Sequence, residues 1–205
     1  MPKLKLTKGE LKRQRDSLRQ YHRYLPTLQL KKQQLQMEIL RQTVLISERS
    51  ANKAAKTRDS LVWSALLTER SVDIRPFLKP ENIKTLIRNV AGVDVPVFDS
   101  AVFGQAEYDL FATPFWIDAA IDILRSIIAL REEIMVLEKG IAVLRHELRI
   151  TTQRVNLFEK VKIPETEETI RRIKISIGDQ MTNAVGRSKI AKKKIEAAIA
   201  AEAFA

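Results

Sequence analysis

The stretch of this 205-residue chain that most resembles a nucleotide-binding motif is Gly-Arg-Ser-Lys at positions 186–189. A phosphate-binding loop needs a glycine, four further residues and then Gly-Lys-Ser/Thr, because its backbone amides and lysine surround the phosphates. The nearest upstream glycine, Gly178, is eight residues before Gly186. The sequence therefore predicts no nucleotide-binding loop.

Histidine and carboxylate side chains are the other candidates for catalysis or metal binding. The two histidines, His22 and His146, have no acidic or histidine partner at metal-ligand spacing. The adjacent glutamates at 132–133 and 167–168 point to different faces if they lie on a helix, so we expect solvated side chains. The chain has no cysteine, which excludes disulfides and thiolate metal sites and is typical of a reducing compartment. We expect a chain that is not an enzyme and binds no cofactor or metal.

Basic side chains are concentrated towards both ends of the chain. Residues 1–60 carry 15 Lys and Arg against 5 Asp and Glu, and residues 61–115 carry 5 against 7, within a net charge of +11. Such a surface is either simply solvated or binds an acidic partner, which could be nucleic acid, anionic lipid or an acidic protein cavity. Residues 187–203 contain no aromatic side chain, which argues against nucleic acid. The candidate partner-contact residues are Lys8, Lys12, Arg13, Arg187, Lys189, Lys192, Lys193 and Lys194.

Two long segments with seven-residue apolar spacing must position these charges, because that spacing is typical of helices that wind around each other. In residues 7–68 the spacing runs through Leu4, Leu11, Leu18 and Leu25 and continues through Leu28, Leu35, Ile39 and Ile46. Thr7 and Glu10 have the form of a capping box, which predicts the helix start. Pro26 predicts a kink, since proline removes a backbone donor inside the helix.

The second segment covers residues 114–200 and has the stronger pattern. One heptad position holds Ile127, Ile134, Ile141, Leu148 and Val155, and the other holds Ile123, Leu130, Leu137, Leu144, Thr151 and Phe158. Pro164 should interrupt the run before Ile170, Ile173 and Ile177 resume it. We expect Gly140 and Gly178 to permit close helix approach. Helices this long must pair lengthwise, and the second should project past the first.

Residues 70–115 between these segments contain helix breakers and predict a small separate element. We expect a short helix near residues 80–89, a short strand at Val93, Val95 and Val97, and residues 101–103 as its hairpin partner. The predicted fold class is mainly α: a long antiparallel coiled-coil hairpin with a small middle cap that contains a short β-hairpin. The predicted domains are an N-terminal long helix at 1–69, the cap at 70–115 and a C-terminal long helix at 116–205.

No part of the sequence predicts secretion or a membrane span. The N-terminus never reaches an apolar core segment, and the most apolar stretch, residues 116–137, carries six charged side chains. We therefore expect a cytoplasmic chain without direct membrane insertion.

Three motifs resemble the D subunit of the V-type and archaeal-type rotary ATPases (ATP synthases). Residues 6–12, Leu-Thr-Lys-Gly-Glu-Leu-Lys, are similar to the family's P-T-K-x-x-L-L opening, and Gly-Val-Asp-Val-Pro at 92–96 is similar to its G-V-x-V-P segment. The C-terminal signature reads approximately R-V-N-A-L-E, then V, I-P and T-I. Leu157 and Phe158 depart from it, as does Pro26 from the commoner uninterrupted helix. The matching residues are Arg154, Val155, Asn156, Glu159, Val161, Ile163, Pro164, Thr169 and Ile170.

The resemblance covers nearly the whole chain and implies a central rotor shaft. Such a shaft couples ATP hydrolysis or synthesis in a ring of catalytic and non-catalytic subunits (A and B) to ion translocation by a membrane rotor. Its implied partners are these ring subunits, a companion stalk protein known as the F subunit, and a membrane-rotor adaptor. It is implied to be peripheral to the membrane, with no nucleic acid bound.

Two other functions fit the residues alone. One is a basic coiled-coil adaptor that binds nucleic acid or anionic membrane, and the other is a stalk protein of a secretion-system ATPase. Co-purification with ATPase ring subunits separates the rotor shaft from the adaptor.

Overall fold

The computed structural model describes residues 5–63, 65–66, 73–106, 108 and 113–203. The first long helix, α1 (Lys8–Leu61), starts where the capping box predicts, since the Glu10 amide donates to Thr7 Oγ1 at 3.3 Å. The Glu10 side chain instead accepts a hydrogen bond from Gln14, so only one half of the box forms. Pro26 lies inside α1 without ending it. The predicted end near residue 68 falls outside the described residues.

The second long segment is divided into α2 (Trp116–Leu157), a π-helical turn η3 (Phe158–Lys162) and α3 (Ile163–Ala203). Pro164 therefore lies in the first turn of α3, directly after the π-helical turn. The interruption predicted at Pro164 is a change of helix type rather than a break, because the π turn accommodates a residue that cannot donate a backbone hydrogen bond. None of the helices in the described part of the chain is long and apolar enough to span a membrane.

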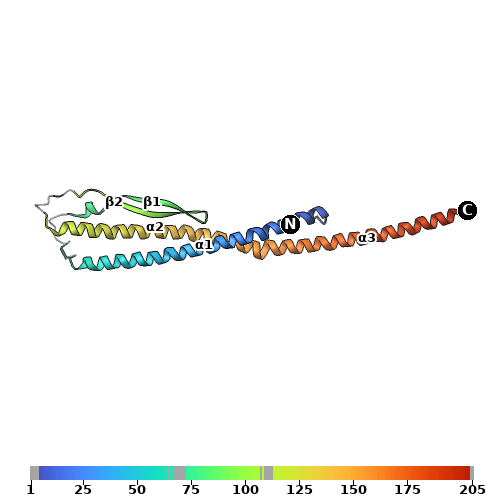
Figure 1. Ribbon diagram of the computed structural model, residues 1–205, viewed down its shortest axis with the longest axis horizontal. Coiled ribbons are helices and arrows are strands. Elements are labelled where there is room, and N and C mark those ends of the chain that lie inside the picture. The colour runs from blue at the N-terminus through green and yellow to red at the C-terminus, as the bar shows by residue number, and fades with distance from the viewer. Residues whose placement is uncertain (1–4, 64, 67–72, 107, 109–112, 204–205) are drawn as a thin grey trace. The chain divides into compact units, whose positions relative to one another are not determined.

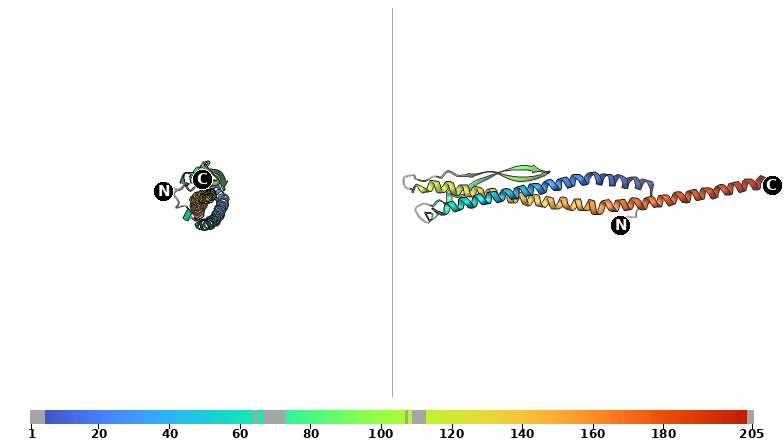
Figure 2. Two further views of the ribbon diagram at one scale, coloured as in Figure 1. Left: turned by 90° about the vertical axis from the view of Figure 1, so that its left-hand side faces the viewer. Right: turned by 60° about the horizontal axis from the view of Figure 1, so that its bottom comes forward.

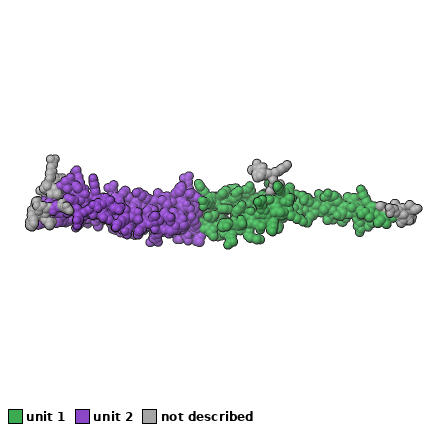
Figure 3. All heavy atoms as spheres, turned by 90° about the horizontal axis from the view of Figure 1, so that it is seen from above, with its two compact units in different colours: residues 1–29, 153–205 green, residues 30–152 purple. Residues whose placement is uncertain are grey.

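The chain forms two compact units, Met1–Gln29 with Gln153–Ala205 (unit 1) and Leu30–Thr152 (unit 2), as Figure 3 shows. In unit 2, α1 and α2 run side by side (Figure 1). Lys31 Nζ lies 2.9 Å from Glu147 Oε1, and Arg49 Nε lies 2.8 Å from Glu133 Oε1. Because the residue number falls along α2 as it rises along α1, the two helices are antiparallel. The predicted fold class, a mainly helical antiparallel hairpin with a small β element, is confirmed.

The middle element is a two-stranded antiparallel sheet, β1 (Pro80–Val90) and β2 (Val93–Phe103), preceded by a 3₁₀ turn η2 (Arg75–Leu78). The predicted helix at residues 80–89 is wrong, because this segment is β1. The predicted pairing of Val93, Val95 and Val97 with residues 101–103 is also wrong, because both lie in β2 and pair with β1.

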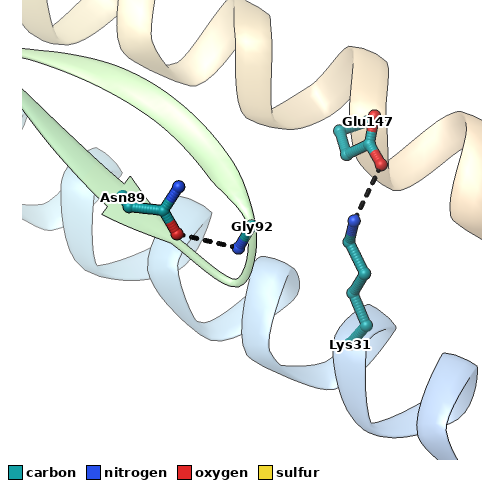
Figure 4. A network of polar contacts seen from close by, with 4 residues as sticks. All are labelled: Lys31, Asn89, Gly92 and Glu147. Carbon is teal, nitrogen blue, oxygen red and sulfur yellow. Dashed lines mark hydrogen bonds and ion pairs between the residues drawn. The ribbon is translucent and has the colours of Figure 1, made fainter.

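A two-residue turn explains both errors. Ala91 and Gly92 have φ values of 51° and 77°, so the chain reverses there and places Val90 opposite Val93. The Gly92 amide donates to Asn89 Oδ1 at 3.0 Å, which supports the turn (Figure 4). Pro96 is tolerated because each strand of a two-stranded sheet is an edge strand.

The core of unit 2 has three layers: α1, α2 and the β-hairpin, which lies along the helices in both Figure 1 and Figure 2. Leu35, Val95 and Leu144 are fully or almost fully buried together, one from each layer. At Gly140 an added Cβ would lie 2.9 Å from Val95 Cγ1 and 3.2 Å from Gln42 Oε1. Gly140 therefore permits the predicted close approach, and the closest neighbour is β2.

In unit 1, α1 packs against the end of α2 and the start of α3. Val155, Ile163, Ile170 and Ile173 are buried, and the Tyr21 and Phe158 rings are 5.3 Å apart. From residue 178 to residue 197 every residue is exposed, and the right-hand view of Figure 2 shows α3 running on with no other described element beside it. The predicted projection of the second helix is thus present. Gly178 has no neighbour within 4 Å of an added Cβ, so the close approach expected there is wrong.

Candidate functional site

The structure gives the chemical candidates no catalytic arrangement. Residues 186–189 lie within α3 and are exposed, so they form a helix rather than a phosphate-binding loop. His22 and His146 are exposed on α1 and α2. Among the described residues there is no cluster of three histidine, aspartate or glutamate side chains able to hold a metal ion.

Two of the four glutamates in the adjacent pairs form ion pairs. Glu133 was expected in solvent, but its side chain is only 19% exposed and forms the ion pair with Arg49. The expectation was wrong because α1 packs against α2 here and brings the cationic side chain of Arg49 beside Glu133. Glu168 is exposed and accepts a hydrogen bond from Arg172 at 3.1 Å, four residues further along the helix.

All eight predicted partner-contact residues are exposed and belong to unit 1. Lys8, Lys12 and Arg13 lie on the first turns of α1, and the other five lie on the uncovered part of α3. Lys192 Nζ lies 3.6 Å from Glu196 Oε1 in an exposed pair, which contributes little to stability. Among the described residues, no ion pair or hydrogen bond links these basic residues of α1 to those of α3. Arg187 Nε donates to Asn183 O at 3.4 Å within α3.

The uncovered part of α3 carries an apolar stripe. At 100° per residue, Met181, Val185, Ile195 and Ile199 fall within about 80° of arc on one face of the helix. Their side chains are between 53% and 61% exposed. Ser188 and Lys192 fall within the same arc, and Ile190, which is 59% exposed, lies on the opposite face. Arg187, Lys189, Lys193 and Lys194 lie on either side of the stripe, so this part of α3 is both basic and amphipathic. Exposed apolar side chains gathered on one face of a helix are typical of a surface that binds another protein, whereas a helix end that stays in solvent does not need them.

A second exposed apolar stripe lies on α1 in unit 2 and was missed by the sequence analysis. Leu30, Met37, Leu40 and Val44 are between 51% and 67% exposed. The sequence signal for this stripe was the spacing of three, four or seven residues between its members. These residues lie on a different face of α1 from the heptad residues that face α2. Beside the stripe, an open groove of about 460 Å³ is lined by Gln34, Met37, Glu38 and Arg41 of α1 and by Val90 and Ala91 of the hairpin.

A further open groove, of about 470 Å³, lies between α1 and α3 in unit 1. Leu18, Ile170 and Ile175 supply its apolar surface, and Arg171 and Lys174 supply a basic rim together with Glu167. Like the exposed stripe of α3, it combines apolar surface with positive charge. Each unit therefore presents exposed apolar side chains, and the two grooves are open to solvent.

Sequence comparisons give this surface a context. A family model that describes the D subunit of ATP synthase matches residues 10–193. A V-type ATP synthase D subunit from Borreliella burgdorferi is 43% identical over 198 residues, which cover 95% of this chain and 96% of the relative. The corresponding proteins from Chlamydia abortus and Chlamydia trachomatis are 36% and 34% identical, and each match covers 94% of this chain and 94% and 96% of the relative, respectively. With a model matching most of its length and relatives aligned almost end to end, the chain belongs to the family of ATP synthase D subunits.

Proposed function

We propose that this protein is the central-stalk rotor axle of a V/A-type rotary ATPase. It couples ATP hydrolysis or synthesis in the catalytic ring to ion translocation by a membrane rotor, and it has no catalytic activity of its own. The observation that carries the proposal is the stretch of α3 at residues 178–197, which is helical, exposed throughout and basic, and which gathers three exposed apolar side chains, Met181, Val185 and Ile195, on one face. Family membership supports the context of a rotary ATPase.

The antiparallel pairing of α1 with α2 suits the transmission of torque. Apolar packing at Leu35 and Leu144 holds the helices together without fixing their register strongly. The Lys31–Glu147 and Arg49–Glu133 pairs act at defined levels and oppose sliding of one helix along the other (Figure 4 shows the first). Half-buried ion pairs of this kind specify register more than they add stability.

The proposed partners follow from the surfaces. The ring of A and B subunits surrounds the uncovered part of α3, with its apolar stripe in contact with the ring and its basic flanks facing acidic groups. The uncharged stripe of α1 at Leu30, Met37, Leu40 and Val44 accepts a companion stalk protein of the F type, and the membrane-rotor adaptor binds elsewhere on unit 2. The chain is thereby peripheral to the membrane as part of the complex.

The decisive experiment changes the basic flanks of α3 in the reconstituted complex. Replacing Lys193 and Lys194 with Glu should slow ATP-driven ion transport several-fold, because two favourable charge contacts become repulsive. The matched control replaces Lys139 and Arg145 with Glu, an equal charge change at two exposed positions of α2. Equal effects of the two double variants on transport and assembly would contradict the proposal.

A truncation separates function from folding. Removing residues 187–205 deletes five basic residues from a part of α3 in which residues 187–197 are all exposed. Assembly or coupling should fall while the thermal midpoint of the isolated chain changes little. A truncated chain that melts far lower yet drives the motor normally refutes the assignment. Micromolar ATP binding to the isolated chain, measured by calorimetry, would contradict its non-catalytic role, and a salt-sensitive DNA gel shift would favour the adaptor function.

A further inference from the structure

The apolar face of the second long helix changes phase by one residue near Pro164. Up to Val155 the buried positions follow the heptad, with Ile134 and Ile141 before it. The next buried position is Ile163, eight residues after Val155 rather than seven, and the heptad then continues at Ile170. The helix therefore contains one residue more than an uninterrupted heptad allows.

The partner helix has no such extra residue. Leu11, Leu18, Leu25, Ile39 and Ile46 of α1 keep multiples of seven throughout and are all partly buried. An extra residue in one helix of a pair rotates everything after it by about 100° unless the backbone absorbs it locally. Because Ile163, Ile170 and Ile173 remain buried, the backbone does absorb it.

The π-helical turn η3 is where the extra residue is accommodated. A π turn bonds residues five apart rather than four, and here the Ile163 amide donates to Phe158 O. Pro164 follows and has no amide hydrogen, so the backbone carbonyl that would receive it lacks that donor. The buried Thr166 hydroxyl donates to Lys162 O at 2.6 Å, a contact of the kind that bends helices. Three departures from regular α-helix thus lie within nine residues.

We propose that residues 158–164 form a torsional joint in the second long helix. The backbone here has fewer regular hydrogen bonds than the helix on either side, so bending and twisting concentrate here. The boundary between the two compact units crosses α2 between Thr152 and Gln153, close to this point. The tilted contact between the Tyr21 and Phe158 rings keeps α1 in contact while the backbone deforms. If the chain is a rotor axle, as proposed above, the joint is its compliant point.

Single-residue deletions test whether the second long helix contains one residue more than the heptad allows and absorbs it at η3. Deleting Glu159, which is exposed within η3, should restore the heptad and shift the thermal midpoint of the full-length chain by no more than about 3 °C. The matched control deletes Arg149, which is exposed in a regular turn of α2. That deletion rotates the apolar face away from α1, and the midpoint should fall by about 10 °C or more. Equal losses from the two deletions would overturn the proposal.

A distance measurement tests the compliance itself. Because the chain has no cysteine, spin labels on Arg149→Cys and Asp179→Cys report on one pair of sites without background. The distance distribution should be broad in the parent chain and clearly narrower when Glu159 is deleted. Distributions of equal width would refute the joint.

Amide exchange gives a second readout in the same full-length chains. Residues 158–163 should exchange at least tenfold faster than the flanking turns, and deletion of Glu159 should abolish the difference; equal exchange in the parent chain would also refute the joint. These measurements use the isolated protein, so a failure of the proposed rotor function would show only in the reconstituted complex.

Discussion

Replacing Gly140 with Ala tests the tightest contact between the β-hairpin and the helices. Two opposing effects determine the result. Alanine favours a helix interior by about 1 kcal/mol over glycine. The new Cβ, however, would lie 2.9 Å from Val95 Cγ1 and 3.2 Å from Gln42 Oε1. Val95 is 1% exposed and cannot move aside without displacing β2.

Overpacking of this kind costs about 1–3 kcal/mol. We therefore expect Gly140→Ala to lower the free energy of unfolding by about 1 kcal/mol. Gly178→Ala is the matched control, because an added Cβ meets nothing within 4 Å there. The helix preference is the same at both sites, so the difference between the two variants isolates the overpacking.

Urea denaturation followed by far-UV circular dichroism measures both free energies. A double variant that adds Val95→Ala should show coupling, with Val95→Ala costing less in the Gly140→Ala background because the crowded methyl is gone. If Gly140→Ala stabilises the chain as much as Gly178→Ala does, the close approach of β2 to α2 is wrong. Additivity in the double variant would lead to the same conclusion.

Four further substitutions, one of them a control, test other parts of unit 2. Leu35→Ala should cost about 2–5 kcal/mol in urea denaturation because Leu35 is fully buried, whereas Leu40→Ala on the exposed stripe should cost well under 1 kcal/mol. Arg125→Lys should lose about 1–2 kcal/mol, since one ammonium cannot replace the guanidinium that donates to the carbonyls of Phe77 at 3.0 Å and Gly104 at 2.7 Å; no loss would show that this contact is unimportant. The hydrogen bond from Tyr108 to Asp118 raises the tyrosine pKa above its ordinary value of about 10, so its stabilisation is complete below pH 10 and disappears as pH rises through the folded-state pKa. Tyr108→Phe should remove this alkaline dependence from the pH profile of the thermal midpoint.

Local patterns in the sequence were sufficient to predict the two long helices and their antiparallel pairing. Seven-residue spacing of Leu and Ile identifies the side of each helix that must be buried, whatever the partner. The capping residue Thr7 marks the helix start for the same reason, because the hydrogen bond that it accepts comes from a residue only three positions away.

The β-hairpin was mispredicted because its pairing depends on contacts that periodicity does not contain. Residues 80–89 have no strict alternation, since β1 is exposed along most of its length and only β2 contributes a fully buried side chain, Val95. A turn at Ala91 required a non-glycine residue with positive φ, which is uncommon. The hairpin is held along the helices by the packing of Val95 against Leu35, Leu144 and Gly140, and by the hydrogen bond from Arg125 to the Gly104 carbonyl.

Part of the candidate contact surface could be predicted from the sequence, and part of it could not. The exposed basic residues of α3 could be predicted, because a charge cluster at the end of a thinning apolar pattern has nothing in the chain to bury it. The exposed stripe of α1 could not, because whether an apolar residue is covered depends on which elements pack against it. The extra residue in the second helix likewise became visible only when burial showed Ile163, and not residue 162, facing α1. The spacing of apolar residues along each helix is determined by the sequence alone. Tertiary packing decides which residues of a helix face its partner, which apolar side chains are covered and which elements approach closely, because these depend on residues far apart in the sequence.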